Sequence, residues 1–276
     1  MKKTIAVIIL PLLITGFSFM TSCNSCKNRN VSEERKKIEM GQADTLEKEI
    51  QSNVYPLPTS AEVIKMLADL EVGYTFGITN PVSKAKRYIT STDKAINMGV
   101  FGADLSYATL YNMNQEVLNY LGAIRTLANE LNMSRIYDET LYDKIKLNFD
   151  NRDELVKILT EAFDKTYSYL VDNDQQVHAL LVVGGAWVEG MYLTTHVSLQ
   201  SYHYAGISRN LLEQKKSFDL YLEITGPYLS DPVLKEFVDN LQPIKDVYKD
   251  LGTSLTQKNI DDISLAIGGV RAKIVK

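Results

Sequence analysis

The sequence is poor in cysteine, proline and glycine. The shortage of cysteine excludes classes of protein, and the shortage of proline and glycine favours one kind of secondary structure. Its 276 residues include two cysteines, Cys23 and Cys26. The rest of the chain therefore has neither a disulfide framework nor a thiol nucleophile, which excludes zinc ribbons and cysteine proteases. Glycine and proline number 15 and 7, and no proline stands between Pro81 and Pro227, which favours long helices. With 45% hydrophobic and 23% charged residues, the chain can bury a sizeable core.

An excess of positive charge is also missing. The chain has 30 basic and 34 acidic side chains, a formal net charge of −4, spread along its length. Proteins that bind nucleic acids cluster lysine and arginine on one face. No DNA or RNA partner is therefore expected.

The amino terminus has the plan of a bacterial lipoprotein signal. Two lysines precede an uncharged apolar run over residues 5–20, which is shorter than the roughly 20 apolar residues of a spanning helix and is typical of a signal peptide. The run ends in Met20-Thr21-Ser22-Cys23, which resembles a lipobox. We predict a cleaved signal over 1–22 and lipidation of Cys23. An ordinary cleaved signal, an uncleaved anchor and lipidation of Cys26 are the alternatives.

Residues 23–52 read as a polar, highly charged tether, and the folded domain is expected over 53–276. Lipoprotein acyl chains bind a membrane durably because each buried methylene contributes ~0.8 kcal/mol. The membrane, reached through the N-terminal lipid, is therefore the expected partner. The expected location is the cell envelope, at the outer membrane facing the periplasm.

Capping signals and apolar spacing predict an all-α domain. Asn151 to Glu154 has capping-box spacing, and Asn80-Pro81 and Asp231-Pro232 place a cap before a first-turn proline. Apolar residues step by three and four along 260–274, as on one face of a helix. We expect helices over residues 59–71, 81–88, 92–131, 138–148, 151–172, 176–204, 208–225, 231–250 and 257–274.

Two of these helices are apolar on all sides, which is typical of buried helices. They centre on residues 95–111 and 179–193, and both carry small residues, including Gly99, Gly102, Gly184, Gly185 and Gly190. A glycine inside a helix costs ~1 kcal/mol against alanine, so close helix approach is the expected reason for keeping it. The two helices should cross at the centre of a single multi-helix bundle.

Each candidate motif for a cofactor or metal lacks a residue or a spacing that the chemistry requires. Gly185 and Gly190 have Walker A spacing, but Met191-Tyr192 replaces the required Lys-Ser/Thr. Ser91-Thr92-Asp93-Lys94 matches the Ser-x-x-Lys of penicillin-binding enzymes, but the companion Lys-Thr-Gly is absent. His196 and His203 are seven residues apart, too far along one helix to share an ion unaided. We expect no cofactor and no metal.

What remains is a set of polar residues on the two buried helices. The first helix carries Asp104, flanked by Tyr107 and Tyr111. The second has a polar stripe within about 80° of arc, which consists of Glu189, Tyr192, His196, Gln200 and His203. An unpaired buried carboxylate is very costly, so we expect Asp104 and Glu189 to pair with tyrosine, histidine or an arginine such as Arg125. A structural network, a ligand pocket and an acid-base pair are the three alternatives.

Four short segments resemble a family of helical lipoproteins of Bacteroidota-type Gram-negative bacteria that has no assigned activity. They are Tyr55-Pro-Leu-Pro-Thr59, Asn80-Pro81-Val82, the segment from Gly99 to Tyr107, and Trp187-Val-Glu-Gly190. The resemblance runs from about Tyr55 to His196 and implies an all-α fold and an envelope location, without a substrate. The expected function is binding or scaffolding by a lipid-anchored envelope protein. The alternative is a small-molecule-binding protein, or a hydrolase or lyase that uses Asp104, Glu189 and His196.

Overall fold

The computed structural model describes residues 73–198 and 205–276, which all belong to one compact unit. These residues form helices joined by short connections, and no strand occurs among them. The predicted all-α fold is confirmed. The expected signal peptide, the tether and the helix over 59–71 lie outside the described residues.

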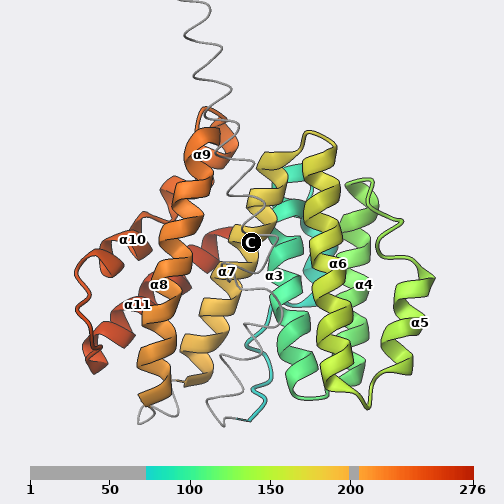
Figure 1. Cartoon of the computed structure of the whole chain (residues 1–276), viewed down its shortest axis with the longest axis horizontal. Coiled ribbons are helices and arrows are strands. Elements are labelled where there is room, and N and C mark those ends of the chain that lie inside the picture. The colour runs from blue at the N-terminus through green and yellow to red at the C-terminus, as the bar shows by residue number, and fades with distance from the viewer. Residues whose placement is uncertain (1–72, 199–204) are drawn as a thin grey trace, which may run out of the picture. The chain divides into compact units, whose positions relative to one another are not determined.

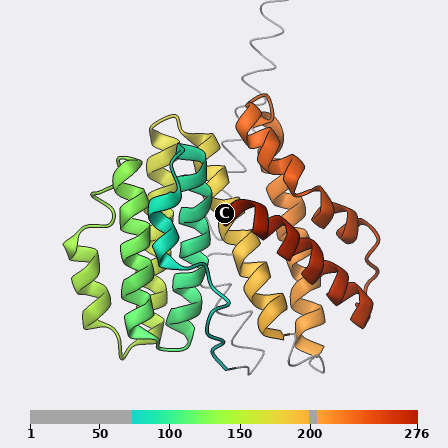
Figure 2. The same ribbon diagram turned by 180° about the vertical axis from the view of Figure 1, so that it is seen from behind.

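The helices match the expected ones closely, with three differences in detail. Their bounds are Val82–Arg87 (η1, a 3-10 helix), Ser91–Leu110 (α3), Asn114–Glu130 (α4), Glu139–Leu147 (α5), Arg152–Asp172 (α6), Gln176–Ser198 (α7), Ala205–Thr225 (α8), Gly226–Tyr228 (η2, 3-10), Pro232–Asn240 (α9), Gln242–Lys249 (α10) and Gln257–Ile274 (α11). Helix α7 lies between α3 to α6 on one side and α8 to α11 on the other (Figures 1 and 2).

The expected single helix over 92–131 is two helices. Helix α3 ends at Leu110, and Asn112 adopts the left-handed conformation with φ 54°. The N–H groups of Asn112 and Met113 donate to the carbonyls of Thr109 and Ala108, which is a Schellman cap. The prediction was wrong here because asparagine, with no glycine in the turn, gives a weak stop signal.

The expected helix over 231–250 is also two helices. It is interrupted at Leu241, after which Pro243 lies in the first turn of α10. A proline cannot donate to a preceding turn, but it fits the start of a new helix. The short helix near 81–88 is the 3-10 helix η1 rather than an α-helix.

Helices α3 and α7 cross at the centre, as their glycines predict. A Cβ added to Gly99 would collide with the carbonyl oxygen of Val182, and one added to Gly185 would collide with that of Ile96. The two backbones therefore touch at this point. Side chains around the crossing are fully buried, including Val100, Phe101, Leu181 and Val188.

Gly102 does not take part in the crossing. A Cβ added to it would meet nothing within 4 Å. It borders a small apolar cavity of about 20 Å³ between α3, α4 and α6, whose lining includes Met98, Leu121 and Tyr137. The expectation that every small residue of α3 serves close helix approach is therefore wrong for Gly102.

The terminal helix α11 packs against α7 and α10. Its predicted apolar stripe is buried, namely Ile260, Ile263, Ile267, Val270 and Ile274. Two polar contacts hold its end: Asn97 Nδ2 donates to the carbonyl of Ile274 at 2.9 Å, and Lys84 Nζ donates to that of Val275 at 2.7 Å. This packing brings Arg271 to the centre of the molecule.

By length and composition alone, α7 could cross a membrane. In the protein, 83% of its most apolar window is buried. Its Trp187 stacks on Phe218 of α8 with ring centroids 4.7 Å apart, and its indole N–H donates to Gln214. These contacts are those of a core helix.

Candidate functional site

The α3–α7 crossing places the two predicted carboxyl groups in one buried cluster. Asp104 lies five residues beyond Gly99, and Glu189 four residues beyond Gly185, so each lies about one turn past the contact of the backbones. Both side chains are fully buried, with 0% exposure. The two carboxyl groups interact with each other, because the helices that carry them are in backbone contact one turn away. This pair, together with Arg271, is called the carboxyl cluster below.

The partner of Glu189 is Arg271 of α11. Arg271 Nε donates to Glu189 Oε2 at 2.6 Å, and Nη2 donates to Oε1 at 2.7 Å. The two parallel bonds form a bidentate ion pair, the strongest arrangement open to these groups. Nη2 also donates to the carbonyl of Ile78 at 3.3 Å.

Arg125, the arginine suggested by the sequence, lies elsewhere. Its Nη1 pairs with Glu139 of α5 at 2.7 Å, and its guanidinium lies over the Tyr142 ring. A signal for the true partner existed in the sequence. Arg271 follows Ile267 by four residues and adjoins Val270, so it lies at the edge of the buried stripe of α11.

Asp104 has a different environment from Glu189. Its Oδ2 accepts a hydrogen bond from the backbone N–H of Asn80 at 3.1 Å, and its Oδ1 faces no donor. Burial raises the pKa of Asp104 well above its usual range, and the adjacent charge of Glu189 raises it further. Burial also raises the pKa of Glu189, against the opposing effect of Arg271.

The two tyrosines that flank Asp104 in sequence belong to another contact. Tyr107 Oη accepts a hydrogen bond from the backbone N–H of Thr75 at 2.7 Å, and its ring stacks on Tyr74 with centroids 4.9 Å apart. Tyr111 meets both of these rings edge-on. The tyrosines thus fasten the segment before η1 to the end of α3, and the expectation that Asp104 pairs with a tyrosine, histidine or arginine was wrong.

Tyr192 and His196 extend the carboxyl cluster towards the surface. The Arg271 guanidinium lies 3.9 Å from the Tyr192 ring centroid, and the rings of Tyr192 and His196 are 3.9 Å apart. Burial and the neighbouring Arg271 charge lower the pKa of His196. The positive charge of the Arg271 guanidinium disfavours a metal cation at the neighbouring His196. No group of three potential ligands occurs among the described residues. Gln200 and His203, the rest of the stripe, lie outside them.

The geometry of the carboxyl cluster favours a structural role. A general acid or base must reach the proton that it transfers, directly or through one water. Asp104 and Glu189 are sealed at 0% exposure, and the helix backbones meet one turn away. Glu189 neutralises Arg271 and so joins α7 to α11, while Asp104 ties α3 to the Asn80 backbone.

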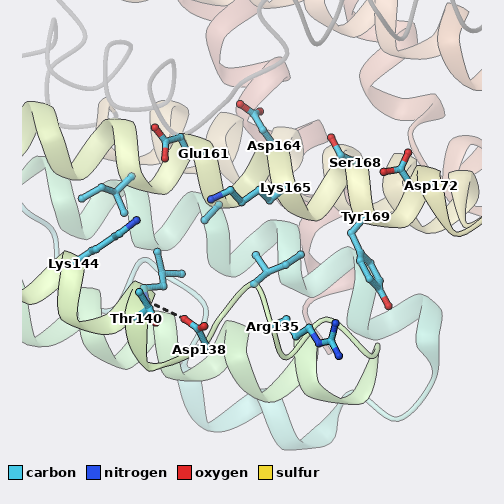
Figure 3. Close-up of a pocket in the computed structure, with 14 residues that line it drawn as sticks. Arg135, Asp138, Thr140, Lys144, Glu161, Asp164, Lys165, Ser168, Tyr169 and Asp172 are labelled. Atoms are coloured by element: carbon cyan, nitrogen blue, oxygen red, sulfur yellow. Dashed lines mark hydrogen bonds between the residues drawn. The ribbon is translucent and has the colours of Figure 1, made fainter.

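A second candidate site is an open groove of about 580 Å³ between α5 and α6 (Figure 3). Its apolar residues are Ile136, Leu141, Ile158 and Ala162. Its charged residues carry both signs, and the set consists of Arg135, Asp138, Lys144, Glu161, Asp164, Lys165 and Asp172. Figure 3 shows the carboxylates of Glu161, Asp164 and Asp172 along α6, with Lys144 and Arg135 across the groove.

The groove exists because α5 packs lightly on α6. Of the α5 residues, Ile145 alone is buried, and the Arg125 contacts tie the helix to α4 instead. No ion pair joins two of the seven charged residues in this described groove. Burial and the nearby Glu161 raise the pKa of Asp164, as expected where a carboxylate lacks a counter-ion.

Comparison of the chain with protein-family models, with curated proteins and with solved structures gives no match. The groove was not predicted from the sequence. Its charged residues look like the solvated face of an amphipathic helix, and the gap depends on how α5 meets α6.

Proposed function

We propose that this chain is a lipid-anchored protein of the bacterial cell envelope that acts by binding, and that the α5–α6 groove takes the ligand. The attachment rests on the lipobox-like Met20 to Cys23, with the domain held at the periplasmic face of the outer membrane. The resemblance to helical envelope lipoproteins agrees with this location.

One observation carries the binding proposal. The groove holds charged side chains of both signs that do not pair with one another, beside apolar residues. Its volume of about 580 Å³ lies within the range of ligand sites. A ligand that carries both charges and an apolar part, such as a short peptide, fits these features.

The enzyme alternative receives less support. The residues proposed for it are Asp104, Glu189 and His196. The two carboxyl groups are sealed, and His196 hydrogen-bonds through Nδ1 to the Tyr192 carbonyl at 3.0 Å. An acid-base reaction would need a substrate to part α3 from α7.

Native mass spectrometry of protein purified from its own envelope tests the proposal. The wild-type protein should carry a bound species, and Ser168→Trp, which fills the groove from α6, should lose it. The matched control is Lys157→Trp on an exposed part of α6 outside the groove, which should keep the species. A wild-type protein without any bound species, or a Ser168→Trp protein that retains it, would contradict the proposal.

A further inference from the structure

The carboxyl cluster contains two fully buried acids and one largely buried base. Asp104 and Glu189 are fully buried, and the Arg271 side chain is 14% exposed. If both acids were ionised, the cluster would hold one uncompensated negative charge, which is very costly in the interior. A single proton on the pair makes the cluster neutral.

The hydrogen bonds indicate which acid holds the proton. Both oxygens of Glu189 accept from the Arg271 guanidinium, so Glu189 is the ionised member. Asp104 Oδ2 accepts from the Asn80 N–H, and Oδ1 has no donor. A proton on Oδ1 turns this orphaned oxygen into a hydroxyl donor, and Glu189 is the carboxyl group that interacts with Asp104. The same proton therefore satisfies the unpaired oxygen and removes the excess charge.

We propose that Asp104 and Glu189 share a single proton at neutral pH, and that this proton keeps the terminal helix α11 fastened to the α3–α7 crossing. Loss of the proton would place two carboxylates side by side against one guanidinium. The resulting repulsion would act on the salt bridge that joins α7 to α11. The contacts of Asn97 and Lys84 with the end of α11 would remain.

Other titratable and charged groups surround the pair on every packed element. They are Tyr88 after η1, Tyr74 in the preceding segment, Tyr107 on α3, Tyr120 on α4, Tyr192 and His196 on α7, and Arg271 on α11. Burial raises the pKa of Tyr88 and of Tyr107, and raises that of Tyr74 to about 12. The raised pKa values keep Tyr74, Tyr88 and Tyr107 neutral up to alkaline pH. Arg271 is therefore the cation that faces the two carboxyl groups.

The direction of the pH effect follows from the raised pKa of Asp104. The folded protein keeps a proton that the unfolded chain loses near pH 3.9. Stability is therefore fully present below that value and falls as the pH rises towards the folded pKa. The unfolding constant should grow about tenfold per pH unit through this window.

Two measurements test the shared proton. Infrared spectra of protein with isotope-labelled aspartate should show the carbonyl band of a protonated carboxyl group at neutral pH, and Asp104→Asn should abolish this band. The free energy of unfolding, measured in urea across the pH range, should depend less steeply on pH in Asp104→Asn. The difference in slope should correspond to one bound proton. The asparagine has the shape of the protonated acid and keeps a donor, so this variant should fold.

The matched control is Asp143→Asn, which changes an exposed aspartate of α5. It should keep both the band and the full pH dependence. Hydrogen exchange, corrected for intrinsic rates, should show α11 losing protection before α6 at alkaline pH in the wild type and not in Asp104→Asn. Absence of the band, or an equal pH dependence in wild type and Asp104→Asn, would overturn the proposal.

Discussion

Arg271 is the residue whose loss should lower the stability of the folded domain most, because it neutralises the buried Glu189. Arg271→Ala would leave Glu189 buried without its cation, which costs roughly 3–5 kcal/mol when one partner of a buried pair is removed. Arg271→Lys should recover only part of this loss, because an ammonium cannot form the bidentate contact with Glu189. Urea denaturation measures both effects.

The exposed pair of Arg125 and Glu139 provides the control for this comparison. Arg125→Ala removes a pair whose side chains are 36% and 72% exposed, and water screens such pairs. It should change stability little. An Arg271→Ala protein as stable as Arg125→Ala would contradict the role given to the carboxyl cluster.

His196 offers a second prediction for a single residue. Its pKa is lowered by burial and by Arg271, so it should titrate below the ordinary value of about 6.5. The folded state then binds the proton less readily than the unfolded state, and this histidine makes stability fall as the pH drops below about 6.5. NMR titration of the ring proton checks the direction. The chain unfolded in urea serves as the reference, and an equal midpoint in both states would refute the prediction.

The sequence allowed the two buried acids to be recognised but not their partners. Asp104 and Glu189 stand out because their neighbours are apolar on most faces. Arg271 is 82 positions from Glu189, and the Asn80 donor is a backbone N–H. Such partners depend on how α11 and the segment before η1 pack, and residue type does not encode that packing.

Helix α3 supplies a matched pair of glycines for the next prediction. Gly99→Ala places a Cβ against the Val182 carbonyl and should destabilise by roughly 1–3 kcal/mol or more, because backbone offers no flexible end to move aside. Gly102→Ala meets open space and should stabilise by up to about 1 kcal/mol through helix propensity. Thermal and urea unfolding of the two proteins tests the crossing. Equal stability of the two variants would contradict it.

The helices themselves could largely be read from the sequence. Apolar spacing of three and four, with caps such as Asn151 and Asp231, locates most starts and faces. The breaks at Asn112 and Leu241 were missed because periodicity continues across them. Neither carries a glycine stop, and Pro243 is tolerated by both a kinked helix and a new one.

For the whole molecule, the proposed lipid attachment at Cys23 is the feature that would hold the domain at a membrane. Cys23→Ser should remove the acyl anchor and release the protein from membranes, because the polar tether contains no apolar segment to replace it. Membrane fractionation after a high-salt wash measures the release. A Cys26→Ser protein should stay attached. Sedimentation of Cys23→Ser with the membranes would refute the lipobox interpretation.

We propose that two separate parts of the domain have separate roles. The carboxyl cluster holds the helices together, and the α5–α6 groove binds the ligand. Native mass spectrometry of Asp104→Asn and Ser168→Trp, each purified from the envelope and checked for folding by thermal melts, tests this proposal most directly. The account predicts that Asp104→Asn keeps the bound species and Ser168→Trp loses it. The reverse result, with a folded Asp104→Asn protein that has lost the species and a Ser168→Trp protein that retains it, would contradict the account.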